Sequence, residues 1–215
     1  MLLEERNFYK PFNYPWAFEA YKTQQHMHWL PDEVPLGDDL KDFREKISDD
    51  NKALLTNIFR FFTQADVDVC CGYATHYLPK FKQPEVRMML ASFANMEAVH
   101  QEAYSLLLET LGFDDSEYQM FTQIQSMSDK HEYLSKFDTE SPMGLAKTMA
   151  VYSAFTEGVQ LFSSFAILLN FPRHNLMKGM GQIVTWSIRD ETLHVEGMSR
   201  LFKEFIRENP ELWND

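Results

Sequence analysis

The stretch Met96-Glu97-Ala98-Val99-His100-Gln101-Glu102-Ala103-Tyr104 decides how this chain is organised. Glu97 and His100 are three residues apart, so on a helix their side chains share one face. A carboxylate beside an imidazole offers two ligands to a transition metal. The same Glu-x-x-His spacing returns at Glu191 and His194. One such pair arises by chance on many solvated helices, but two pairs, each within a long apolar helix, indicate a metal site.

The pattern of apolar residues predicts a helical protein throughout. Periodicity and helix-end signals predict four long helices, over residues 48–78, 84–112, 141–171 and from 173 onward. The third is apolar on nearly all sides, so we expect it to be central. The glycines of Met177–Gly181 predict an irregular start to the fourth. We expect an N-terminal arm, residues 1–36, with a short helix near Trp16–His28, packed on one helical domain of residues 37–215.

Single carboxylates complete the pattern in the other two long helices. Asp66 falls within the apolar stripe of the first helix, and Glu157 interrupts the third. A buried carboxylate needs a partner or a metal ion. An isolated Glu157 is more often a hydrogen-bonded core residue, but six such residues in four apolar helices make that interpretation improbable. The sequence therefore predicts an all-α, ferritin-like bundle with a dinuclear metal site between four long helices, although these bundles usually have glutamate at both single positions.

The ligand types indicate which metals the site would hold. Oxygen-rich ligands with one imidazole per metal suit iron or manganese, whereas structural zinc favours thiolates. The sequence leaves open two irons, two manganese ions or a mixed pair. Four carboxylates carry four negative charges, which two divalent ions would balance in a core where they are otherwise costly.

Composition narrows the class of protein. The chain has 215 residues, of which 45% are hydrophobic and only 8 are glycine, which favours one helical domain with a sizeable core. The formal net charge of −12 argues against nucleic-acid binding.

The sequence also indicates a cellular setting. We find no run of about 18 apolar residues that would cross a membrane. The start of the chain lacks the pattern of a secretory signal, and adjacent Cys70 and Cys71 rarely bridge, which favours a reducing, cytoplasmic setting.

Tyr104 lies one helical turn beyond His100, close to the predicted metals. Leu161 and Phe165, four and eight residues after Glu157, are placed to wall a dry pocket around it. A tyrosine in such a pocket can lose an electron and a proton and persist as a radical. An ordinary core tyrosine with a bonded hydroxyl fits the spacing equally well.

These motifs resemble those of the small, radical-generating subunit of class I ribonucleotide reductase. The resemblance covers nearly the whole chain and is strongest in residues 96–104, 155–162 and 186–194. It implies that one metal is held by Asp66, Glu97 and His100, and the other by Glu157, Glu191 and His194, with some carboxylates bridging.

The same resemblance assigns roles to three further residues. Tyr104 matches the radical tyrosine, and Trp29 matches the electron-relay tryptophan. Asp190 matches the acid that links this tryptophan to a metal-bound histidine, here His100. Without the resemblance, Trp29 would be interpreted as a packing aromatic and Asp190 as a surface acid.

The resemblance also implies an activity and partners. We expect a homodimer in which dioxygen, or an oxidant derived from it, generates a tyrosyl radical that is passed to a large subunit for ribonucleotide reduction. The family chain usually continues well beyond the last Glu-x-x-His, so we expect this sequence to lack the C-terminal part. The alternatives are a dinuclear oxidase or oxygenase acting on a lipid or small molecule, which would not need Trp29, and a metal-storage bundle, which would not need a protected tyrosine.

Overall fold

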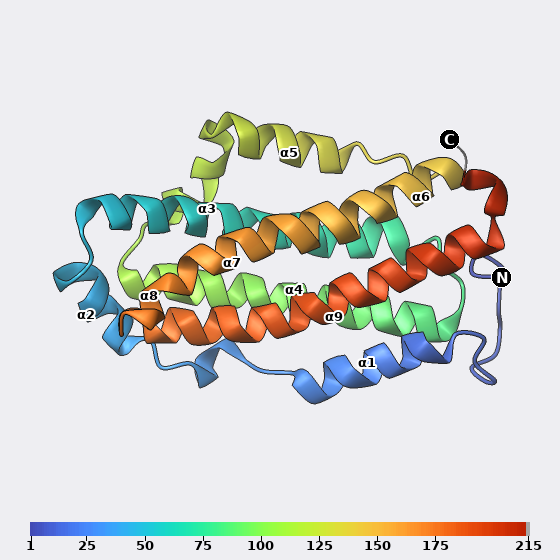
Figure 1. The fold of residues 1–215 in the computed structure, drawn as a ribbon, viewed down its shortest axis with the longest axis horizontal. Coiled ribbons are helices and arrows are strands. Elements are labelled where there is room, and N and C mark those ends of the chain that lie inside the picture. Colours follow the sequence, from blue (N-terminus) through green and yellow to red (C-terminus); the bar gives the residue numbers. More distant parts are fainter. Residues whose placement is uncertain (214–215) are drawn as a thin grey trace.

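Long helices running along one axis form the body of the molecule (Figure 1). The computed structural model describes residues 1–213, and these contain helices and no strand. The predicted all-α, ferritin-like fold is confirmed. The α-helices are α1 (Pro15–Met27), α2 (Gly37–Glu45), α3 (Asp49–Gly72), α4 (Pro84–Leu111), α5 (Gln125–Ser135), α6 (Pro142–Val151), α7 (Phe162–Leu168), α8 (Asn170–Arg173) and α9 (Lys178–Glu208). Two π-helical segments are η2 (Tyr73–Tyr77) and η4 (Tyr152–Leu161), and short 3-10 turns are Pro31–Glu33, Asp115–Gln123 and Pro210–Leu212.

The helix-end signals in the sequence act where they were expected. The Ser48 hydroxyl accepts the Asn51 amide at the start of α3. Pro84 opens α4, which ends at Gly112 with a left-handed φ of 86°. The Ser141 hydroxyl accepts the Gly144 amide at 3.0 Å ahead of α6.

The fourth predicted helix begins only at Lys178, because Asn175 and Met177 before it have left-handed φ values of 63° and 51°. The predicted irregularity is thus confirmed at Met177, whereas the helix is regular from Lys178 onward despite its two early glycines. Acidic side chains of α2 satisfy the free amides of its first turn. The Asp39 carboxylate accepts from the amides of Gly179 and Met180 at 2.9 and 2.8 Å, and the Asp42 carboxylate accepts from Met177 at 3.0 Å. This cap, with carboxylates at the positive end of the helix dipole, outweighs the weak helix propensity of glycine.

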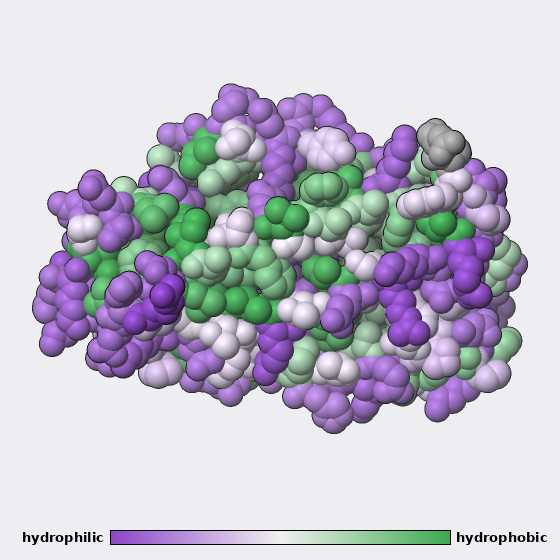
Figure 2. Space-filling view, in the orientation of Figure 1, coloured by the Kyte–Doolittle hydropathy of each residue, from purple (hydrophilic) through white to green (hydrophobic). Residues whose placement is uncertain are grey.

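The third predicted helix is divided into α6, η4 and α7, and one of its faces is exposed. Phe155 and Val159 are 65% and 63% exposed because no element of the described chain covers this face. Apolar surface accordingly gathers over the middle of the molecule in Figure 2. The expectation of a central helix, apolar on all sides because it is buried on all sides, therefore holds for only part of its surface.

By length and composition alone, Pro142–Arg173 is the single stretch of residues 1–213 that is long and apolar enough to cross a membrane. Its mean hydropathy is high enough for a membrane span, although it contains no unbroken run of about 18 apolar residues. Glu157 lies at its middle and faces the bundle, where His194 of α9 is 3.9 Å away. The stretch is thus a helix of the bundle in this structure.

The core consists of two apolar clusters, and acidic residues lie where they meet. On α4, Met96 belongs to one cluster and Phe93 to the other, with Glu97 beside them. On α3, Ala65 belongs to the first cluster and Val69 to the second, and Asp66 lies between them. The bundle therefore places a buried polar layer between two apolar ends.

The N-terminal residues lie along the body. Helix α1 packs against α4 and α9 (Figure 1). Trp29, which follows it, is only 3% exposed. This packing brings residues near the start of the chain to the buried polar layer.

Candidate metal centre

Six side chains from four helical segments meet in the polar layer. They are the sequence-predicted ligands Asp66 of α3, Glu97 and His100 of α4, Glu157 of η4, and Glu191 and His194 of α9. Each is at most 1% exposed. Such complete burial of four acids and two imidazoles needs strong compensation, because an isolated buried charge is costly.

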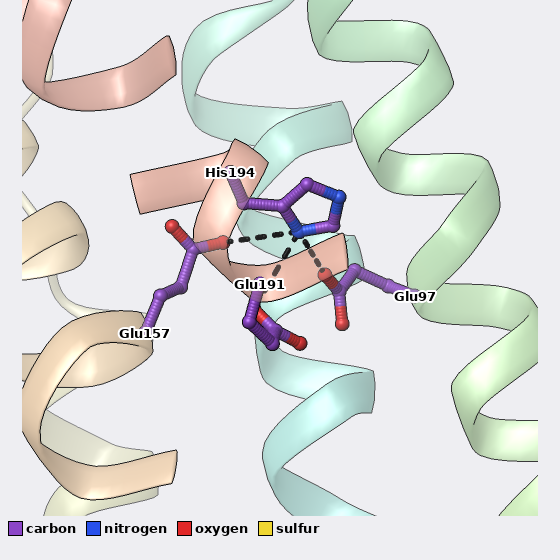
Figure 3. A group of neighbouring side chains, drawn as sticks. All are labelled: Glu97, Glu157, Glu191 and His194. Atoms are coloured by element: carbon purple, nitrogen blue, oxygen red, sulfur yellow. Dashed lines mark ion pairs between the residues drawn. The ribbon is translucent and has the colours of Figure 1, made fainter. Parts of the chain in front are cut away.

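One group surrounds the ring of His194. Figure 3 shows its imidazole between Glu157 and Glu97, with Glu191 from the same helix beside it. His194 Nδ1 lies 2.8 Å from Glu97 Oε1, 3.5 Å from Glu191 Oε2 and 3.9 Å from Glu157 Oε1. One ligand atom from each of these four residues lies within 4.8 Å of the others, which is close enough to share one ion.

A second group adjoins the first. Asp66, Glu97 and His100 also offer ligand atoms within 4.8 Å of one another. His100 Nδ1 lies 3.5 Å from Glu97 Oε2 and 3.3 Å from Glu191 Oε1. Glu97 therefore belongs to both groups, and Glu191 contacts both histidines, so both carboxylates are placed to bridge two ions.

Unpaired atoms are concentrated in this cluster. Six buried side-chain atoms of these residues make no hydrogen bond of normal geometry: Asp66 Oδ2, Glu97 Oε1 and Oε2, Glu157 Oε2, Glu191 Oε2 and His194 Nδ1. The Glu97 and Glu191 atoms among them contact the histidines only as ion pairs, at 2.8 to 3.5 Å. Buried polar atoms without partners are rare in folded proteins. The ligand set of the two groups, four carboxylates and two imidazoles, fits cations such as iron or manganese. Cys70 and Cys71, which zinc would favour, stand outside both groups.

The metal-free cluster holds protons. Burial, together with the charge of Glu97, raises the pKa of Asp66 well above its usual range. Burial also raises the pKa of Glu157. Burial alone would lower the pKa of His194, but contact with Glu191 and Glu97 outweighs it and raises the pKa to about 10. A cation entering the site would therefore displace protons.

Outer partners orient both imidazoles in the same way. His100 Nε2 lies 3.2 Å from Asp190 Oδ2, and His194 Nε2 lies 3.1 Å from Gln24 Oε1. Each ring thereby turns Nδ1 toward the carboxylates, as in metal sites where a second residue fixes the histidine tautomer. Gln24 Nε2 also donates to Asp190 Oδ1 at 3.0 Å, so one residue of α1 links both outer partners.

Trp29 joins this arrangement from the N-terminal side. Its indole Nε1 donates to Asp190 Oδ2 at 2.8 Å. Its ring also stacks on His100, with centroids 5.9 Å apart. The structure thus connects Trp29, Asp190 and His100 through hydrogen-bonding contacts within the core.

Tyr104 lies in a dry aromatic pocket. Its hydroxyl is buried without a hydrogen-bond partner of normal geometry, and the Ser187 hydroxyl nearby is unpaired as well. Burial, followed by the charge of Asp66, raises the pKa of Tyr104. Its ring stacks on Phe62, with centroids 4.6 Å apart, and Phe62 stacks on Phe165. Leu161 is fully buried in the same apolar cluster.

Three residues around the site were not anticipated from the sequence: Gln24, Phe62 and Tyr73. The Tyr73 hydroxyl donates to Glu157 Oε1 at 2.5 Å. Phe62 stands four residues before Asp66, a helical spacing that can be noticed in the sequence. Gln24 and Tyr73 reach the site through tertiary packing and belong to no motif.

A close helix contact supports this side of the site. Gly72 lies against Tyr152, whose hydroxyl donates to the carbonyls of Asp68 and Val69 at 3.1 and 2.6 Å. A Cβ atom at Gly72 would overlap the Tyr152 hydroxyl and ring. Glycine here thus allows η4 to approach the end of α3.

We therefore expect Gly72→Ala to destabilise the protein. Overpacking of this kind costs about 1–3 kcal/mol. Thermal unfolding followed by circular dichroism should show a lower midpoint. Gly37→Ala is the matched control, because nothing lies within 4 Å of a Cβ atom built there. Equal midpoints for the two variants would contradict the tight contact.

Comparison with known proteins gives one consistent family. The family model for "Ribonucleotide reductase, small chain" matches residues 6–215. The chain is 51% identical over 222 residues to the "Probable ribonucleoside-diphosphate reductase small subunit 376L" of Invertebrate iridescent virus 6, covering 97% of this chain and 62% of that protein. It is 30% identical over 217 residues to the ribonucleoside-diphosphate reductase subunit beta of Chlamydia pneumoniae, covering 94% and 63%.

Solved structures share the fold. The ribonucleotide reductase R2 subunit from Clostridium botulinum superposes with a TM-score of 0.90 at 20% identity, covering 98% of this chain and 68% of that one. An R2-like ligand-binding oxidase, solved with a Mn/Fe cofactor, gives a TM-score of 0.74 at 19% identity, covering 91% and 72%.

The curated relatives are longer than this chain, which spans about 60% of their length. The match nevertheless extends over almost all of the chain itself and includes both Glu-x-x-His pairs. The resemblance noted in the sequence is thereby confirmed, and the chain belongs to the ribonucleotide reductase small-chain family.

Proposed function

We propose that Asp66, Glu97, His100, Glu157, Glu191 and His194 hold two iron ions, two manganese ions or one of each. The proposal is supported by the six cluster atoms that make no hydrogen bond of normal geometry and by the negative charge of the four carboxylates. Two divalent cations would balance four carboxylates, and Glu97 and Glu191 are placed to contact both. The Mn/Fe cofactor of the R2-like oxidase accords with this assignment. Bound ions of this kind supply redox chemistry with dioxygen, or an oxidant derived from it, which amino-acid side chains lack.

Tyr104 is the residue that would carry the radical. It would give one electron to the oxidised metal pair and its phenolic proton toward Asp66, the carboxylate whose charge acts on it most strongly, and remain as a neutral tyrosyl radical. Its burial at 1% exposure and the surrounding Phe62 and Phe165 rings keep water and reductants away. The Tyr104 hydroxyl makes no hydrogen bond of normal geometry, and the Ser187 hydroxyl is its polar neighbour, so no acidic side chain is hydrogen-bonded to it.

The single observation that carries the proposal is the chain of contacts from Trp29 through Asp190 to His100. An oxidase that acts on its own small-molecule substrate has no need of such a connection. A protein that lends an oxidising equivalent to another polypeptide needs one. Asp190 holds the indole of Trp29 and the imidazole of His100 in fixed positions. Because these groups are buried, water does not compete for their hydrogen bonds.

Together these features support the role of the small subunit of a class I ribonucleoside-diphosphate reductase. The radical would pass to a large subunit that holds the ribonucleotide and reduces it to the deoxyribonucleotide. We place this activity in the cytoplasm, without a membrane or nucleic-acid partner.

Replacing Trp29 by phenylalanine tests this role. The variant loses the indole donor to the buried Asp190 carboxylate, at a cost of about 1.5–3 kcal/mol, but keeps an aromatic ring against His100. Metal content and tyrosyl radical should remain. Ribonucleotide reduction, assayed with a large subunit wherever the wild-type chain supports turnover, should fall to background.

The matched control is Trp186→Phe. The Trp186 ring contacts Trp29 at 5.2 Å between centroids, yet its indole has no bond to Asp190. This variant should keep most of the activity. Full turnover of Trp29→Phe would refute the electron-relay role and leave the oxidase as the better interpretation.

We also propose that the chain forms a homodimer, in which the exposed apolar surface of η4 and α7 is one region available for contact. Static light scattering at micromolar concentration should give about twice the monomer mass of 25.3 kDa. A mass near that of the monomer would contradict dimerisation of this chain.

A further inference from the structure

A second tyrosine, Tyr73, touches the site directly. Its hydroxyl donates to Glu157 Oε1 at 2.5 Å, and both side chains are completely buried. Its ring also meets the imidazole of His194 edge-on, with centroids 6.1 Å apart and planes at 78°. No other tyrosine hydroxyl of residues 1–213 is hydrogen-bonded to one of the six cluster residues.

Tyr73 and Tyr104 lie on different sides of the cluster. Tyr104 stacks within the apolar cluster that contains Phe62 and Phe165, and the charges that act on it most are those of Asp66 and His100. Tyr73 belongs to the other apolar cluster. The two hydroxyls also differ in environment, since that of Tyr104 has no partner and that of Tyr73 has a carboxylate acceptor.

The position of Tyr73 is fixed by its neighbours. Its ring packs edge-on against Tyr152 and Tyr77, at 5.7 and 6.4 Å between centroids. Tyr152 is held against α3 at Gly72 by its two bonds to backbone carbonyls. Tyr73 lies in the π-helical segment η2 and Glu157 in η4, and π-helical turns occur often at functional sites.

We propose that Tyr73 is a second oxidisable side chain of this site, serving as the electron donor on the Glu157 side when Tyr104 is unable to give an electron. The inference rests on the proposed function, because it requires the oxidised metal pair as the oxidant. The bound metal pair would supply the oxidising equivalent and would take up one electron from the Tyr73 ring. The O–H bond of Tyr73 breaks, its proton moves to Glu157 Oε1, and a neutral tyrosyl radical remains.

Oxidation of Tyr73 would protect the metal ligands. Without an electron donor, the oxidised metal pair would oxidise the side chains around it, and His194 and the carboxylates are the nearest. A hydrogen-bonded tyrosine yields its electron and proton together without moving, because its acceptor is already in place. Tyr73 differs in this from Tyr77, which is also buried but whose hydroxyl has no partner.

The test is freeze-quench electron paramagnetic resonance after iron(II)-loaded protein is mixed with dioxygen. In Tyr104→Phe we expect a short-lived tyrosyl signal. It should be lost in Tyr104→Phe/Tyr73→Phe and kept in Tyr104→Phe/Tyr77→Phe, the matched control. Metal content measured on the same samples shows that each variant has loaded.

A second measurement avoids removing the hydroxyl. Site-specific 3-fluorotyrosine in place of Tyr73, in the Tyr104→Phe background, keeps the ring and its bond to Glu157. The short-lived signal should then show an added fluorine splitting, whereas 3-fluorotyrosine in place of Tyr77 should leave it unchanged. This result stands even if Tyr73→Phe fails to fold or to load metal.

The outcomes separate the two proposals. A tyrosyl signal without fluorine splitting, or none in Tyr104→Phe when the wild type forms one, overturns the role of Tyr73 alone. A wild-type radical that already shows splitting from position 73 supports Tyr73 and overturns Tyr104 as the radical site. Absence of any tyrosyl signal in loaded wild type and variants overturns both.

Discussion

Glu97→Ala should abolish loading of both metal ions, reducing about two ions per chain to nearly none. Glu97 is the only one of the six residues that belongs to both ligand groups, so its loss damages both at once. Metal content after incubation with iron(II) or manganese(II) and desalting measures the effect directly. A second readout is thermal unfolding, because an ion at 100 times its dissociation constant stabilises the wild type by about 2.7 kcal/mol. The variant should show no such gain.

Glu102→Ala is the control for this experiment. Glu102 lies on the same helix but is exposed, so its loss changes neither metal content nor the stabilisation by metal. The metal-free Glu97→Ala protein should remain helical, because Glu191 still contacts both histidines after the Glu97 carboxylate is removed. Two ions bound by a folded Glu97→Ala protein would show that the ligand assignment is wrong.

Tyr104→Phe should eliminate the persistent tyrosyl radical while leaving metal content unchanged. The substitution removes a hydroxyl that makes no hydrogen bond of normal geometry and whose polar neighbour is only the Ser187 hydroxyl. The ring keeps its stacking on Phe62, and we expect stability to change by less than about 1 kcal/mol. Electron paramagnetic resonance minutes after exposure to dioxygen measures the radical, well after any short-lived signal has decayed.

Tyr77→Phe is the matched control, since Tyr77 is equally buried and its hydroxyl is also unpaired. It should retain the persistent signal. If Tyr104→Phe kept the signal at full intensity, the radical would belong to another residue.

Much of the fold could be predicted because local signals determine it. Pro84, Gly112 and the pair Ser141-Pro142 mark helix ends by backbone chemistry that needs no tertiary contact. The two Glu-x-x-His pairs work in the same way, since a spacing of three fixes a common helix face. The helix-end signals predicted the all-α bundle, and the Glu-x-x-His motifs indicated the small-chain family. Both predictions are confirmed.

Other features depend on contacts between distant segments and had no local signal. The regular start of α9 depends on Asp39, about 140 residues earlier in the chain. The π-helical segment around Glu157 accompanies the docking of Tyr152 at Gly72, which no periodicity reveals. Hydropathy likewise shows that a helix face is apolar but does not show whether another element covers it, as Phe155 illustrates.

The division of the six residues into two groups that share Glu97 has a consequence for biosynthesis. Asp66, Glu97 and His100 have all been synthesised once residue 100 is added, whereas the other group is complete only with His194, 94 residues later (194 − 100). At about 5–20 residues per second that interval lasts several seconds. Helices α3 and α4, which contact each other extensively, can pair within it. A nascent chain could thus capture a first ion before α9 exists, and the second would follow only when the bundle closes.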